Sequence, residues 1–191
     1  MKPCQVASSL FLAALLGGCV SPAAYVDKSS LPSPQAGYVG AQFVSTSAKF
    51  ISALVLENVV TQQEYVLPFA NQAFTSTPHV ETGMLALPPG KYKIAKWLAY
   101  NSTSKGTEFT RKISSGLLAR DFEVSTGKVV FLGKLSGGTT WTPAILSART
   151  ESGIQAMPVT DLAARKLLAD SYPAYSSMAF ACLLCAPANP G

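Results

Sequence analysis

Short runs of alternating apolar and polar residues, separated by Gly, Pro, Asn and Ser, fill the chain from about Tyr38 to Arg149. Such alternation is typical of strands that bury one face. The pattern predicts strands at residues 38–44, 50–60, 64–69, 82–87, 91–100, 107–114, 119–124, 128–135 and 141–149. A series of short strands at regular spacing, with turn signals between them, predicts a mainly β fold, an antiparallel β-sandwich.

Turn residues mark where several of these strands end. Pro88-Pro89-Gly90 predicts a tight turn, because proline fixes φ and glycine is free to adopt positive φ. Ser125-Thr126-Gly127 predicts a hairpin between its two flanking strands, and Gly137-Gly138 marks the end of the second of them.

Residues 91–100 show the clearest alternation. The side chains expected to share one face are Tyr92, Ile94, Leu98 and Tyr100, and those expected opposite are Lys91, Lys93 and Trp97. Lys96 interrupts the apolar face, so we expect it near a sheet edge or a water-filled gap.

One helix is predicted over about residues 159–171. Pro158 and either Thr160 or Asp161 supply start signals, and Pro173 supplies the stop. The narrow apolar stripe consists of Ala163, Ala164, Leu167 and Leu168. We expect this helix to cover an open end or edge of the sheets. The apolar segment Met178–Ala186 is too short to span a bilayer and is predicted to be a final strand or a buried plug.

The N-terminus carries an export signal. Lys2 precedes an apolar run that starts at Val6 and closes with Leu16-Gly17-Gly18-Cys19. The run is a secretion signal, because a membrane-spanning helix needs roughly 20 apolar residues. It resembles the lipobox of bacterial lipoproteins, which implies cleavage between Gly18 and Cys19 and lipid on the sulfur and amine of Cys19. The alternative is an ordinary signal peptide with a chance cysteine.

The chain is therefore expected to have three parts. Residues 1–18 are the signal peptide, residues 19–37 a lipidated N-terminus and flexible tether, and residues 38–191 the folded domain. The tether has too few apolar side chains to offset the entropy of ordering. More than one acyl chain on Cys19 gives stable attachment to membrane lipid. Val20, in place of an aspartate, favours the outer membrane, with the domain facing the periplasm.

Two segments resemble a recurring pair in transthyretin-like (prealbumin-like) β-sandwich domains of bacterial envelope proteins. The first, Met84–Ile94, contains an apolar-Pro-Gly-x-Tyr hairpin pattern; the second, Phe122–Gly133, contains Phe-x-Val-x-x-Gly-Lys. The resemblance covers roughly residues 40–150 and implies a transthyretin-like or immunoglobulin-like fold of uncharacterised function. Because one fold hosts many activities, it implies no activity.

The charge pattern argues against a nucleic-acid partner. The chain has 15 Lys and Arg against 10 Asp and Glu, a net charge of +5, and the positive residues are scattered singly. A nucleic-acid-binding arm would be denser. These charges are expected to form a solvated surface with weak attraction to anionic headgroups or glycans.

The sequence contains no recognisable catalytic set. His79, the only histidine, stands at an expected strand start without a nucleophile elbow, and the carboxylates are scattered singly. One histidine and two cysteines complete a tetrahedral zinc site only with a carboxylate, which the sequence does not identify. We predict a non-enzymatic protein without cofactor or metal; a hydrolase that depends on His79 is a third hypothesis.

Cys182-Leu183-Leu184-Cys185 is the one motif with chemistry of its own. Since Cys4 leaves with the signal and Cys19 takes lipid, Cys182 and Cys185 are the remaining thiols, and an oxidising compartment favours their pairing. Thioredoxin-type enzymes use this spacing at the N-terminus of a helix. Here the motif lies in an apolar run near the C-terminus, where burial raises a thiol pKa, which favours a structural disulfide or an inert pair over a redox centre.

The favoured hypothesis is a lipid-anchored envelope protein with a non-enzymatic binding, structural or assembly role. Its expected partner is an envelope protein, or peptidoglycan or another glycan. The predicted contact site is the polar loop at Tyr100, Asn101, Ser102, Thr103 and Lys105. The alternative is a periplasmic thiol–disulfide or metal-handling protein that acts through Cys182 and Cys185.

Overall fold

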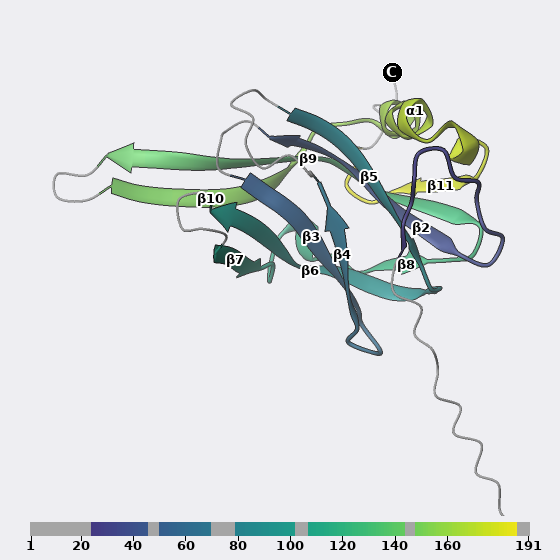
Figure 1. Ribbon diagram of the computed structural model, residues 1–191, viewed down its shortest axis with the longest axis horizontal. Helices are drawn as coiled ribbons and strands as arrows, with labels where there is room; N and C mark the ends of the chain where they lie inside the picture. Colours follow the sequence, from purple (N-terminus) through teal and green to yellow (C-terminus); the bar gives the residue numbers. More distant parts are fainter. Residues whose placement is uncertain (1–23, 46–49, 70–78, 102–106, 144–147, 187–191) are drawn as a thin grey trace, which may run out of the picture.

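The computed structural model describes residues 24–45, 50–69, 79–101, 107–143 and 148–186, which form two β-sheets and one α-helix (Figure 1). The strands of the first sheet are β1 (Ala24–Tyr25), β2 (Gly37–Ser45), β5 (His79–Leu87), β9 (Lys128–Pro143), β10 (Ala148–Met157) and β11 (Ala179–Cys182). Those of the second sheet are β3 (Phe50–Asn58), β4 (Glu64–Pro68), β6 (Gly90–Asn101), β7 (Thr107–Lys112) and β8 (Phe122–Val124).

In each sheet, one long strand pairs with two different strands along the same edge, one near its beginning and one near its end. The first sheet has the order β1-β5-β2-β9-β10, and β11 pairs with the beginning of β9. The second has the order β4-β3-β6-β7, and β8 pairs with the beginning of β6. The prediction of a mainly β fold with one α-helix is confirmed for the described residues. A wholly antiparallel arrangement is wrong, because β2 and β11 both run parallel to β9.

The two sheets share one apolar core. The first sheet contributes side chains that include Val39, Ala41, Phe43, Leu85, Leu87, Val130, Leu132 and Leu135. The second contributes side chains that include Leu54, Leu56, Tyr65, Leu67, Tyr92, Ile94 and Trp97. Removal of this apolar area from water is the main favourable term for the fold, at about 25 cal/mol per Å².

The helix α1 (Asp161–Ser171) lies on the other face of the first sheet, so the protein has three layers (Figure 1). Ala164 and Leu168 of α1 pack in a second core with Tyr38, Val129 and other outward-facing residues of the sheet. The predicted helix is confirmed within two residues, but it covers a sheet face instead of an end or edge. Among the described residues, no helix has the length and apolar character needed to cross a bilayer.

Two tight connections carry the chain from one sheet to the other. Pro88-Pro89 joins β5 to β6, and residues 125–127 join β8 to β9. The predicted hairpin at 125–127 is therefore wrong, because the strands on its two sides belong to different sheets. The two corners lie side by side, since Gly90 pairs with Val124. Turn residues signal a change of direction, but they do not say which sheet receives the next strand.

A bulge in β6 changes which side chains face the core. Opposite β3, Leu56 pairs with Ile94 while the preceding Val55 pairs with Lys96, so Ala95 is an extra residue. The extra residue reverses the alternation, and Trp97 is buried with only 5% exposure instead of lying opposite Ile94 as predicted. Lys96 lies on an inner strand, between Val55 of β3 and Lys112 of β7, and not at a sheet edge as predicted; its Nζ lies 2.7 Å from Oε2 of Glu64.

β9 continues beyond its predicted end. It runs through Gly137-Gly138 to Pro143 and pairs with β10, a strand that the sequence did not predict. The pairing with β2 stops at Gly137, so residues 138–143 and 148–153 form a two-stranded ribbon that reaches away from the body (Figure 1). The predicted strand 141–149 is wrong, because its described residues belong to the ends of two different strands.

The chain packs on the domain from Ala24, within the segment that the sequence predicted as a tether. We call residues 24–36 the N-terminal strap. Ala24 and Tyr25 pair with β5, Val26 is buried, and the Val26 amide donates to the carbonyl of Met84 at 2.9 Å. The flexible-tether prediction is therefore wrong for residues 24–37, since backbone pairing with an open sheet edge supplies contacts that composition does not reveal.

Candidate functional site

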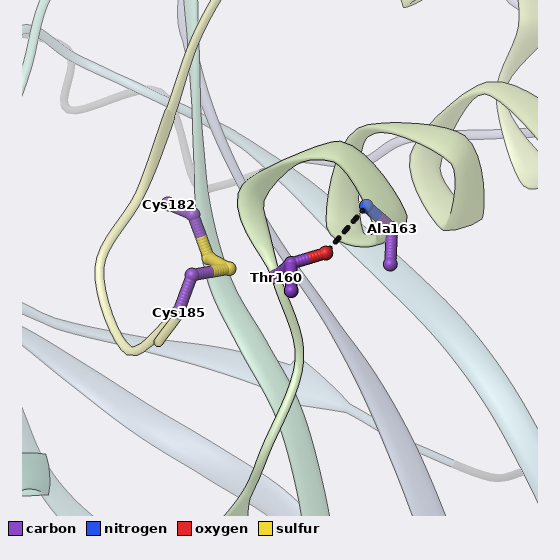
Figure 2. The surroundings of a disulfide bond; sticks show 4 residues. All are labelled: Thr160, Ala163, Cys182 and Cys185. Atoms are coloured by element: carbon purple, nitrogen blue, oxygen red, sulfur yellow. Dashed lines mark hydrogen bonds between the residues drawn. A yellow bond between two sulfur atoms is a disulfide. The ribbon is translucent and has the colours of Figure 1, made fainter. Parts of the chain in front are cut away.

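The C-terminal segment contains the one motif that the sequence singled out for chemistry. Cys182 and Cys185 form the expected disulfide, with Cα atoms 5.5 Å apart (Figure 2). Cys182 is the last residue of β11, opposite Phe131 of β9, and both cysteines are half-buried. Of the two predictions for Met178–Ala186, the final strand is confirmed. A strand that pairs with β9 also brings the disulfide against the body of the domain.

The disulfide loop is held on both sides by backbone hydrogen bonds. The Leu183 amide donates to the Phe131 carbonyl at 2.8 Å, and the Ala186 amide donates to the Val159 carbonyl at 2.9 Å. Leu184 lies over Gly133, where an added Cβ would stand 3.3 Å from the Leu184 Cβ. The loop therefore links β9 to the segment that enters α1.

The disulfide lies beside the first turn of α1 (Figure 2). Thr160 is extended, and its hydroxyl accepts a hydrogen bond from the Ala163 amide at 3.3 Å, which caps the helix. The unpaired amides of a helix start carry partial positive charge, which favours a nearby thiolate. The arrangement differs from that of thioredoxin-type enzymes, because here the helix precedes the cysteines in the chain and does not begin at them.

Two shallow hollows flank the disulfide loop and share Pro158 and Ala186. The first, of about 510 Å³, is also lined by Lys134, Val159, Thr160, Ala163, Lys166, Leu167 and Asp170. The second, of about 400 Å³, is also lined by Leu117, Arg120, Ala156, Met157, Leu183, Leu184 and Cys185. Their walls are mostly apolar, and the Lys166 ammonium in the first lies 2.8 Å from an Asp170 oxygen.

The chemistry open to a disulfide is thiol–disulfide exchange, in which a thiolate attacks one sulfur and the other sulfur leaves. The bonded sulfurs offer no thiolate to a metal ion while the disulfide persists. Within the part of the chain that the structure describes, no group of three His, Cys, Asp or Glu side chains is placed to hold a metal. The bond closes a short ring and fastens the last strand, which is a structural use that needs no reaction.

The tyrosines with shifted pKa values lie in the packed body and do not line either hollow. Burial raises the pKa of Tyr172 far above its ordinary value, and a hydrogen bond with Tyr25 acts in the same direction. Burial also raises the pKa of Tyr38 and of Tyr65. In a cleft with groups tuned for proton transfer, shifted pKa values would surround an open site. Here the raised pKa values of the tyrosines result from burial in the packed body.

The structure describes only part of the predicted sites. Gly18 and Cys19, with the whole signal, lie outside the described residues. In the predicted contact loop Tyr100 and Asn101 end β6, whereas Ser102, Thr103 and Lys105 lie outside the described residues. His79 begins β5, opposite Ser45 of β2.

Strand register brings several connections to one end of the body, which the sequence analysis missed. Ser45 pairs with His79, Phe50 with Tyr100, and Asn101 with Thr107. We call this the loop end. The opposite end, the corner end, consists of Pro88-Pro89, residues 125–127 and the β3–β4 turn at 59–63. No local pattern reveals this grouping, because it depends on strand order.

Comparison with known proteins leaves the family open. No protein-family model and no curated protein matches the sequence. A solved structure described as a leucine-rich repeat protein from Bacteroides thetaiotaomicron VPI-5482 aligns with 55% of this chain at 14% identity and a TM-score of 0.32. This chain covers 14% of that one. A similarity at this TM-score carries no argument about fold or function.

Proposed function

We propose that this chain is an exported, lipid-anchored protein of the bacterial cell envelope with a non-enzymatic binding, structural or assembly role. Acylated Cys19 holds it in the outer membrane, with the domain facing the periplasm. Its partner is an envelope protein, or peptidoglycan or another glycan.

The observation that carries this proposal is the Cys182–Cys185 disulfide. Disulfides persist in oxidising compartments such as the periplasm and are rare in the cytosol. The bond therefore agrees with the export that the lipobox-like stretch predicts at the opposite end of the chain. Its place between β9 and the start of α1 supports a structural use within a domain that works outside the cytosol.

We assign the two-sheet body to the transthyretin-like or immunoglobulin-like sandwiches that the sequence resembles. In support, each of the two quoted segments contains an inter-sheet corner, and the two corners meet through the Gly90–Val124 pair. Sandwiches of this kind gather their loops at the two ends, where partners bind. The loop end, which includes Tyr100 and Asn101, is the proposed binding surface.

Anchoring is tested by intact-mass analysis of the membrane fraction. The native protein should begin at Cys19 and carry the mass of its acyl chains. Cys19→Ala should abolish both the cleavage and the added mass, whereas Cys4→Ala, a matched change inside the signal, should leave both intact. A native product with an unmodified Cys19 sulfur contradicts the proposal.

Binding is tested by crosslinking in intact cells followed by mass spectrometry. The native domain should capture the same envelope component reproducibly. Tyr100→Ala with Asn101→Ala at the loop end should reduce that capture, whereas Thr126→Ala at the corner end should not. Absence of a reproducible crosslinked component, or equal loss in both variants, contradicts the proposed role of the loop end.

Thiol–disulfide exchange is a second candidate, favoured by the half-buried disulfide beside the first turn of α1. A reactive pair requires one thiol with a depressed pKa. After mild reduction, Cys182 or Cys185 should then alkylate quickly at neutral pH, and the reduced pair should bind Zn²⁺ if the protein handles metal. Slow alkylation of both thiols dismisses exchange, and absence of Zn²⁺ binding dismisses metal handling.

A further inference from the structure

We infer that the corner end faces the membrane in which Cys19 is anchored and that the loop end points away from it. This inference rests on the proposed acylation of Cys19 and adds the orientation of the domain. The surface that the corner end approaches is the lipid bilayer that holds the acyl chains.

The first step is the short reach between lipid and domain. The chain is fixed to the first sheet from Ala24, which pairs with Ala86, and the next residues are held by Val26, buried and hydrogen-bonded to Met84. Five residue steps separate Cys19 from Ala24, so even a fully extended chain spans at most about 18 Å. A tether that extended to residue 37 would have allowed about 60 Å.

The second step is the position of Ala24 along the body. β5 runs from His79 at the loop end to Leu87, which directly precedes the Pro88-Pro89 corner. Ala24 faces Ala86, one residue from the end of that strand. The chain therefore enters at the corner end, and the lipid can lie only a short distance from it.

The third step is the chemistry of the corner end. Val60, in the β3–β4 turn, has 82% of its surface exposed, and Pro88 and Pro89 are also exposed. The turn is joined to the corner, because the Val59 amide donates to the Lys91 carbonyl at 2.8 Å.

Ion pairs balance the charges of two lysines at the beginning of β6, beside that turn. The Lys91 ammonium lies 2.8 Å from a carboxylate oxygen of Asp121, and the Lys93 ammonium lies 2.8 Å from a carboxylate oxygen of Glu57. Lysines paired in this way present little net charge to the headgroups. Exposed valine and proline beside such pairs fit close approach to a bilayer held by acyl chains, without a basic patch for anionic lipid.

Site-specific fluorescence tests the orientation. Under the proposed function the mature chain has no free thiol, since Cys19 carries lipid and Cys182 and Cys185 are bonded. Val60→Cys at the corner end and Val80→Cys near the loop end are matched, because both are exposed valines. Each acylated variant is labelled with bimane and reconstituted in phosphatidylcholine vesicles that contain lipid with a nitroxide headgroup.

We expect several times stronger quenching of the label at position 60 than at position 80. Insertion of about 15 Gly and Ser residues before Ala24, which adds roughly 20 Å of reach, should bring the two signals close together while the protein still sediments with the vesicles. Equal quenching at both positions, or stronger quenching at position 80, in protein that sediments with vesicles overturns the orientation alone. If the protein carries no acyl mass and stays in the supernatant, the proposed function itself is overturned, and the orientation with it.

Discussion

The phenol oxygen of Tyr175 lies 3.0 Å from the Oγ of Ser30, although 145 positions separate the two residues. Tyr175 ends the 3-10 turn Pro173–Tyr175 that follows α1, and its ring meets the Tyr38 ring edge-on with centroids 5.0 Å apart. The N-terminal strap is therefore fastened to the C-terminal layer as well as to β5. This contact holds the strap at Ser30, in addition to the pairing of Ala24 and Tyr25 with β5.

Tyr175→Phe should lower the free energy of unfolding by about 1 kcal/mol, because it removes one partly buried hydrogen bond and keeps the ring packing. Urea unfolding measures the loss, and hydrogen exchange should show it first in residues 27–36. Ser30→Ala should cost a similar amount, and the double variant should cost little more than either single one. Fully additive losses would mean that the two side chains do not act on each other.

Replacement of both disulfide cysteines, Cys182→Ala with Cys185→Ala, should lower the free energy of unfolding by about 2 kcal/mol, the loop-entropy value for so short a ring. Reduction of the native protein should lower its urea midpoint to a similar level. The double variant, measured alongside, should not respond to reductant. An unchanged midpoint in the variant would show that the bond does not stabilise the fold.

Gly133→Ala should destabilise the protein by roughly 1–3 kcal/mol, since φ at this position is +113° and an added Cβ would press on Leu184. Gly153→Ala is the matched control in the neighbouring strand, because no atom lies within 4 Å of its added Cβ. That control should leave stability unchanged or slightly raised. Thermal unfolding of both variants checks the difference, and equal effects would contradict the close packing of the disulfide loop on β9.

Alkaline pH should destabilise the fold through its buried phenols. Burial raises the pKa of Tyr38, Tyr65 and Tyr172 in the folded state above the ordinary value of 10.0. The unfolded chain then loses these protons first, so the contribution of these phenols to stability is constant below about pH 9 and falls above about pH 10, by up to about 1.4 kcal/mol per pH unit for each phenol. Urea midpoints measured at pH values below and above the ordinary tyrosine pKa give this slope. Tyr172→Phe should make it shallower, and a slope identical to that of the native protein would exclude this phenol as a contributor.

Local pattern predicted the elements that bury one face. In β4, buried Tyr65 and Leu67 alternate with exposed Glu64 and Val66, so the period of two is visible in the sequence. The helix was also predictable, because Thr160 caps it and a proline follows it.

Features that depend on distant partners were not predictable. The bulge at Ala95 is defined only by its register with β3, and β10 lacks a strong apolar alternation because most of it pairs only with β9. The strap is poor in apolar residues, yet Val26 is buried there. In the candidate site, spacing predicted the cysteine pair. Its position beside α1 follows from the parallel pairing of β11 with β9, which no local pattern encodes.

The parallel β9–β11 pairing has a consequence for the order of assembly. β11 ends at Cys182, so the beginning of β9 lacks this neighbouring strand until residues 179–182 have been made. Pairs of such long sequence separation form slowly. Under the proposed export, a chain that enters the periplasm from its N-terminus completes this sheet only after residues 179–182 have followed.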